Sequence, residues 1–81
     1  MAKTFHLTIA KVGENLFDGE AVSATLPGEE GMFTVMANHE AFVTPLKKGD
    51  AHVETTDGAK QTFSITGGIA EVSNNQATVL L

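Results

Sequence analysis

Apolar and polar residues alternate along most of the chain, with the period of two that is typical of β-strands with one buried face. In the opening segment Phe5, Leu7 and Ile9 share one side, while His6 and Thr8 share the other. Because later stretches repeat this alternation, the chain is predicted to be all-β. The stretches are Val22, Ala24 and Leu26; Phe33 and Val35; Phe42, Thr44 and Leu46; Ala51, Val53 and Thr55; Phe63 and Ile65; Ala77, Val79 and Leu81.

Turn-forming residues separate these stretches at short intervals. Asp57-Gly58 predicts a type I′ turn, which needs positive φ at both central residues, and hence a hairpin from Thr55 to Phe63. Asn74-Asn75 predicts a second tight hairpin. Gly67-Gly68 predicts a bulge or a close backbone approach between the sheets.

Residues 1–81 are predicted to form a single domain, a flattened two-sheet sandwich or barrel of about ten strands. One helical turn is conceivable at Ala37–Glu40, but residues 32–44 are interpreted as a strand, a loop and a strand. A chain this short buries only about 60 to 65% of the surface that its unfolded form exposes. Because it has no cysteine for a disulfide, a partner protein is the expected support for its thin core.

The charge balance and the short apolar runs restrict the classes of partner. Ten acidic residues against five lysines, with no arginine, give a formal charge of −5, which argues against nucleic-acid binding. The adjacent basic pair Lys47-Lys48 is interpreted as a solvated turn. No apolar run exceeds three residues, whereas a membrane-spanning helix needs about 20, so no direct membrane insertion is expected. Four polar residues also interrupt any signal-peptide core: Thr4, His6, Thr8 and Lys11.

The chain carries no recognisable catalytic, metal or cofactor motif. The three histidines are far apart in the sequence and lack a close histidine or cysteine partner, so no metal site is predicted at His6, His39 or His52. The serines occupy strand positions outside a G-x-S-x-G turn. The glycines fit neither a P-loop nor a dinucleotide fingerprint, and no cofactor is predicted. Adjacent Glu29 and Glu30 diverge in an extended chain and are interpreted as a solvated acidic loop.

The segment from Met32 to Leu46 does not fit a self-contained sandwich, because apolar side chains fall on both of its faces. Met32 and Met36 lie opposite Phe33 and Val35, and Val43 follows Phe42. A strand that is apolar on both sides is either central in the domain or covers a partner with its second face. The sequence leaves both possibilities open.

An ordered set of motifs resembles the N-terminal domain of the ATP synthase epsilon subunit over essentially the whole chain. The motifs are Met1-Ala2-Lys3-Thr4-Phe5-His6-Leu7, Phe17-Asp18-Gly19-Glu20, Thr25-Leu26-Pro27-Gly28-Glu29-Glu30-Gly31, Phe33 with Val35, His39, Leu46-Lys47-Lys48-Gly49, Thr66-Gly67-Gly68-Ile69-Ala70-Glu71-Val72 and Ala77-Thr78-Val79-Leu80. The resemblance implies a ten-stranded sandwich that is no enzyme by itself. It implies a rotor subunit that grips the gamma subunit and rests on the c-ring, peripheral on the cytoplasmic face of a bacterial membrane or the equivalent organelle side.

The same resemblance implies which residues meet those partners. Glu29, Glu30, Met32 and His39 would face the c-ring, and the stretch Glu40, Ala41, Phe42, Val43 and Thr44 would run along gamma. The chain departs from the family at two places in this region: Met32 stands where members usually have Glu, and Ala37-Asn38 stands where they have Pro-Gly. Pro45 within a strand suggests a sheet edge at which gamma could dock. The family usually continues into a C-terminal helical hairpin, which these 81 residues do not include, so no inhibitory brake is expected from them.

Two other classes of function compete with the rotor hypothesis. One is a free-standing sandwich that binds a small ligand or glycan, although the chain lacks Trp and Tyr, the aromatic residues that suit such sites. The other is a small hydrolase that uses Glu29 or Glu30 with His39, for which no nucleophile is evident.

Overall fold

The computed structural model describes residues 3–81, so the Met1-Ala2 start of the first motif lies outside the described residues. These residues form eight β-strands and no helix, which confirms the all-β prediction. The strands are β1 (Phe5–Lys11), β2 (Glu14–Gly28), β3 (Gly31–Met36), β4 (Phe42–Leu46), β5 (Gly49–Thr55), β6 (Lys60–Ile65), β7 (Gly68–Ser73) and β8 (Gln76–Leu80). In this part of the chain there is accordingly no helix that could cross a membrane.

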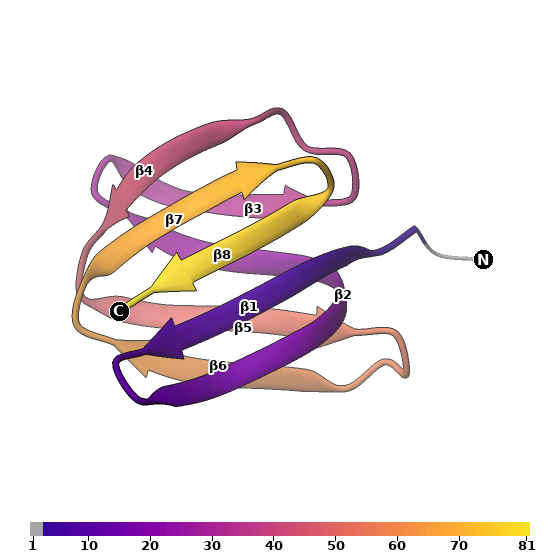
Figure 1. The fold of residues 1–81 in the computed structure, drawn as a ribbon, viewed down its shortest axis with the longest axis horizontal. Helices are drawn as coiled ribbons and strands as arrows, with labels where there is room; N and C mark the ends of the chain where they lie inside the picture. Colours follow the sequence, from indigo (N-terminus) through magenta and orange to yellow (C-terminus); the bar gives the residue numbers. More distant parts are fainter. Residues whose placement is uncertain (1–2) are drawn as a thin grey trace.

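The strands pack as a two-layer sandwich in which β2 belongs to both layers (Figure 1). One layer has the order β2–β1–β8–β7–β4, and the other has the order β3–β2–β5–β6. The pairing of β1 with β8 is parallel, and the other strand pairs are antiparallel. At the far end of β2, Gly28 pairs with Leu46 of β4, which joins the two layers at that corner.

The strand count is eight, so the prediction of about ten strands was too high. The main difference is β2, which runs 15 residues without a break. Its first half pairs with β1 and its second half pairs with β3 and β5. This single strand therefore contributes to both layers, where two separate strands could have been expected. Register shifts at Leu16 and Val22 let it bend from one layer into the other, as β-bulges do.

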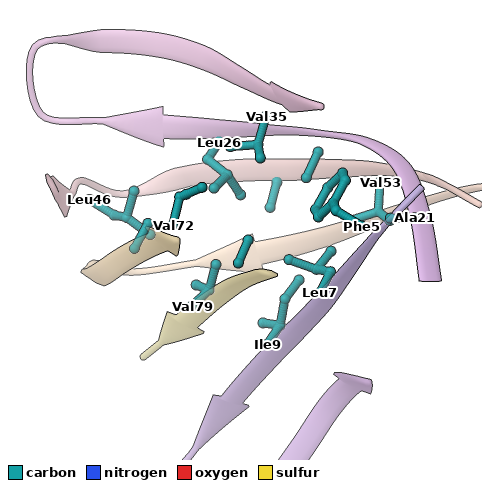
Figure 2. Packing of buried hydrophobic residues seen from close by; sticks show 14 of the residues in the cluster. Phe5, Leu7, Ile9, Ala21, Leu26, Val35, Leu46, Val53, Val72 and Val79 are labelled. Atoms are coloured by element: carbon teal, nitrogen blue, oxygen red, sulfur yellow. The ribbon is translucent and has the colours of Figure 1, made fainter. Parts of the chain in front are cut away.

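The core lies between the two layers and consists of aliphatic side chains and one phenylalanine (Figure 2). Phe5, Leu7 and Ile9 of β1 are fully buried, as their alternation predicted. The bulge at Val22 changes the alternation in β2, so that Ala21 is buried while Val22 is half-buried. The buried apolar residues are Phe5, Leu7, Ile9, Ala21, Ala24, Leu26, Val35, Leu46, Ala51, Val53, Ile65, Ala70, Val72, Ala77 and Val79.

Both predicted hairpins are present, but one has a different turn. Asn74 and Asn75 have φ of 51° and 59° between β7 and β8, which is the type I′ conformation. The type I′ prediction at Asp57-Gly58 was wrong, because only Gly58 has a positive φ, of 84°. Gly58 N donates to Thr55 O at 3.0 Å and Thr55 N to Ala59 O at 2.9 Å, the pattern of a three-residue loop with a glycine bulge.

A close backbone approach does occur at Gly68, but it joins neighbouring strands of one layer and not the two sheets that were predicted to meet there. A Cβ atom on Gly68 would lie 2.2 Å from the carbonyl oxygen of Leu80, and Gly68 has φ of 127°. Gly68 pairs with Leu46 at the start of β7, so this approach fixes the corner where β4, β7 and β8 meet.

Candidate functional site

A groove of about 530 Å³ opens between β3, at the edge of one layer, and β4, at the edge of the other. In Figure 1 these two strands and the loop that joins them lie at the top of the molecule. The groove is lined by all of the predicted contact residues except Glu29 and Ala41, together with three others from β2 and β3. Its lining residues are Gly28, Glu30, Gly31, Met32, Phe33, His39, Glu40, Phe42, Val43 and Thr44.

The tight β2–β3 hairpin forms one end of the groove. Gly28 pairs with Gly31, so Glu29 and Glu30 occupy the two-residue tip and are exposed. A Cβ atom on Gly28 would lie 2.9 Å from the carbonyl oxygen of Gly31 and 3.0 Å from the ring of Phe33. Only glycine therefore lets the hairpin close against the aromatic ring. Glu29 N donates to Pro45 O at 3.1 Å, which ties this tip to β4.

The loop of residues 37–41 forms the other end and is held by Asn75 of the β7–β8 turn. Asn38, with φ of 63°, donates its backbone N–H to Asn75 Oδ1 at 2.8 Å. Asn75 Nδ2 in turn donates to Thr4 O at 2.9 Å. His39 N donates to Met36 O at 3.2 Å, which closes a turn directly after β3. The loop prediction for this segment is confirmed, and Asn75 is a positioning residue that its turn motif alone did not reveal.

Aromatic side chains form the floor of the groove. The rings of Phe33 and Phe42 meet edge to face, with centroids 5.3 Å apart and an interplanar angle of 76°. His39 lies against Phe42 with a centroid distance of 5.0 Å. His39 Nδ1 donates to Glu40 O at 2.9 Å, because the carbonyl oxygen can only accept. These contacts hold the three rings against one another in the free domain.

Apolar side chains that border this floor are uncovered. Met32 is 54% exposed and Val43 is 60% exposed, and Met36 at the end of β3 is exposed to a similar degree. Among the described residues, β3 pairs with β2 alone and β4 lies at the edge of its layer. The strands of residues 32–46 are thus edge strands, so a central position in a sheet does not explain why both of their faces are apolar. Pro45 stands on an edge strand, as its presence in a strand suggested.

The electrostatic character of the groove is acidic. Glu30 and Glu40 are exposed at its rim, and neither lysine nor arginine is among its lining residues. Glu29 is exposed at the hairpin tip beside it, and Ala41 is exposed in the loop. The combination of an aromatic floor, uncovered methionine and valine, and an acidic rim suits an apolar partner with basic residues at its margin.

The residues proposed for hydrolysis do not assemble. The hydrogen bonds and ion pairs found among residues 3–81 include none between His39 and Glu29 or Glu30. The three histidines stand on separate segments, and the described part of the chain holds no cluster of three or more His, Cys, Asp or Glu side chains suited to a metal ion.

A close cluster of three titratable groups that the sequence analysis missed lies on the outer face of β1 and β2. His6 Nε2 lies 2.6 Å from Asp18 Oδ1, and His6 Nδ1 lies 3.4 Å from Glu20 Oε2. The hydrogen bond that His6 donates to Asp18 is the main cause that raises the pKa of His6 above 6.5, and Glu20 adds to it. The β1–β2 register brings these residues together, and no local pattern encodes that register.

Fold and groove together define a β-sandwich domain with an open groove between two edge strands, and residues 3–81 show no assembled catalytic group. Residues 4–81 match the family model described as the beta-sandwich domain of the ATP synthase delta/epsilon chain. The chain belongs to this family, which is one of ATP synthase subunits. This confirms the resemblance and the prediction that the chain is not catalytic by itself.

Individual relatives agree with the family model. The ATP synthase epsilon chain of Delftia acidovorans is 36% identical over 77 residues, which are 95% of this chain and 56% of the relative. That of Chlorobium limicola is 36% identical over 78 residues, which are 96% of this chain and 89% of the relative. This chain thus spans about half the length of the first relative and most of the second.

A solved structure shows the same fold inside an assembled synthase. The mitochondrial ATP synthase of Euglena gracilis, resolved as an assembly of OSCP, F1 and c-ring, contains a chain that superposes with a TM-score of 0.89 at 28% identity. The match covers 95% of this chain and 49% of the other. The fold and the sequence thus favour an ATP synthase subunit over the ligand-binding and hydrolase alternatives.

Proposed function

We propose that this domain is a non-catalytic rotor element of the central stalk of a proton-translocating ATP synthase, where it links the gamma subunit to the c-ring and couples rotation to ATP synthesis. The observation that carries the proposal is the groove between the free edges of β3 and β4, with its aromatic floor and uncovered apolar rim. A surface of this kind is suited to hold another protein and offers nothing for bond chemistry.

The two partners would divide the surface around the groove. Glu29 and Glu30 at the hairpin tip, with Met32 and His39, would meet the c-ring, and residues 40–44 would lie along gamma. Met32 is 54% exposed, so apolar burial would replace at this contact the carboxylate that the family resemblance leads us to expect there. In this arrangement the domain lies peripherally at the membrane, on the cytoplasmic face in a bacterium or on the equivalent side in an organelle.

The partners must cover more than the groove. A stable interface buries about 800 Å² on each side. This is about one sixth of the 4863 Å² that the domain exposes. Binding to the folded state alone raises stability by about 2.7 kcal/mol when the partner is present at 100 times its Kd. A thin domain of 81 residues therefore gains a substantial part of its stability from being held.

A matched pair of substitutions tests the proposed surface. Val43→Asp places a carboxylate at the groove, and Val12→Asp places the same group at a fully exposed valine in the β1–β2 turn. We expect purified gamma to bind the wild-type chain and the V12D variant alike. The V43D variant should bind at least about tenfold more weakly, because a buried carboxylate without a partner is costly. Absence of gamma binding by the wild-type chain, or equal affinity of both variants, would refute the assignment.

A further inference from the structure

β3 is one of the edge strands of the sandwich, together with β4 and β6. Among the described residues β3 pairs only with β2, and at the corner of the sandwich β4 pairs with β2 at Gly28 instead of covering β3. Its other side therefore has backbone donors and acceptors that no strand of residues 3–81 pairs with.

The register identifies which backbone groups are free. Met32 lies opposite Pro27, which has no N–H, and the carbonyl oxygen of Pro27 instead accepts from Lys47 N at 2.9 Å. The pair Pro27–Met32 is therefore one of the non-bonded pairs of the antiparallel ladder, and these alternate with bonded pairs. It follows that Met32, Thr34 and Met36 direct their N–H and C=O groups away from β2, and that all of these groups except the carbonyl oxygen of Met36, which accepts from His39 N at 3.2 Å, are open to a partner strand.

This edge lacks the devices that normally keep an edge strand from pairing. Natural edges are protected by lysine, proline, bulges or charged side chains. Residues 31–36 contain none of these, with the sequence Gly-Met-Phe-Thr-Val-Met. The other edges do have them: β4 carries Pro45, β6 begins with Lys60, and the first half of β2 has a bulge at Leu16 and exposed acidic residues. An unprotected edge beside an apolar groove is suited to be covered by a partner.

We propose that a strand of the gamma subunit adds to the free edge of β3 by antiparallel or parallel pairing with the backbone of Met32, Thr34 and Met36, while the side chains of Glu30 and Met32 remain available for the c-ring contact proposed above. This inference rests on the proposed function and specifies how the partner is held. The added strand carries alternating apolar residues, which pack on Phe33, Phe42 and Val43. It carries lysine or arginine near its end, because Glu40 stands at the rim without a basic neighbour in the groove lining.

Proline substitutions at the two ends of one cross-strand row test the pairing. Thr34 of β3 and Thr62 of β6 are both exposed and lie on edge strands. The Thr34 hydroxyl shares a hydrogen bond with Thr25 at 2.9 Å, and the Thr62 hydroxyl shares one with His52 at 3.3 Å. Thr34→Pro removes an N–H that the partner strand would use, and Thr62→Pro removes an equivalent N–H on the opposite edge. Thr34→Ala loses the hydroxyl and keeps the N–H.

We expect T34P to bind gamma at least about fivefold more weakly than the wild type, since it loses a backbone hydrogen bond and its ring crowds the incoming strand. T62P and T34A should bind like the wild type. In the unmodified chain, hydrogen exchange gives a second reading that does not depend on the folding of variants. The amides of Met32, Thr34 and Met36 should exchange rapidly in the free chain and become protected when gamma is added.

The outcomes separate this inference from the proposed function. If V43D weakens gamma binding while T34P does not, and the three amides stay unprotected, strand addition is wrong and the rotor assignment stands. If the wild-type chain does not bind gamma, both are wrong. A T62P variant that loses as much affinity as T34P contradicts a role for the β3 edge. Self-association of the free chain that T34P abolishes would assign the edge to a second copy and overturn the gamma assignment.

Discussion

Gly68 allows a sharp test of how the corner of β4, β7 and β8 is held together. In the Gly68→Ala variant the new Cβ would lie 2.2 Å from Leu80 O, 3.1 Å from Leu80 C and 3.1 Å from Leu81 Cα. A carbon–oxygen contact between strands is normally about 3.3 to 3.6 Å. All three neighbours are backbone atoms, so no side-chain rotation can relieve the clash and a strand must move.

The expected cost has two parts. The φ of 127° is disfavoured for a residue with a Cβ, which costs about 1 to 3 kcal/mol, and overpacking costs about 1 to 3 kcal/mol more. The sum of about 2 to 6 kcal/mol is a large part of the free energy of unfolding, which is about 4 to 12 kcal/mol for a domain of this size. Gly13→Ala is the matched control, because Gly13 has φ of 81° but no atom within 4 Å of the added Cβ. It should lose only the strain of about 1 to 2 kcal/mol.

Urea denaturation of the wild type and the two variants measures these losses. We expect unchanged m-values and a midpoint for G68A that lies below that of G13A, by a difference in free energy of at least about 1 kcal/mol. Equal losses in the two variants would show that the close approach of Gly68 to Leu80 does not determine the cost, and the reasoning would fail.

Two further changes probe the core and the outer face. Leu7→Ala removes a fully buried side chain and should lower the free energy of unfolding by about 3 to 5 kcal/mol. Val12→Ala, at a fully exposed site, should lower it by less than about 0.5 kcal/mol. Similar losses of the two variants in urea denaturation would contradict the assigned core. Because Asp18 and Glu20 raise the pKa of His6 above 6.5 in the folded state, this group adds stability that is fully present below about pH 6.5 and is lost as the pH rises through the folded pKa. NMR titration should show the pKa of His6 fall back towards 6.5 in the Asp18→Asn variant, and an unchanged His6 titration in that variant would refute the assigned cause. As the pH rises, the wild type should lose stability relative to the His6→Gln variant.

The sequence by itself determined the fold class, the strands with a strict alternation, and the family. Phe5, Leu7 and Ile9 are buried as their period of two required, because that period is a property of the extended chain alone. Asn74-Asn75 makes the predicted tight turn for an equally local reason, since Asn tolerates positive φ. The ordered motifs placed the chain in its family because they cover its whole length.

Only the tertiary structure decided how β2 is shared between two layers, what type of turn Asp57 and Gly58 form, and how His6 comes to lie beside Asp18. It also decided that Met32 and Val43 border one groove with a free edge beside it. These features depend on pairing between residues that are distant in the chain, and a shift of one residue in register would invert every side chain of a strand. The physical reason is that alternation specifies which face of a strand is buried, whereas the choice of neighbouring strand is set by the packing of the whole core.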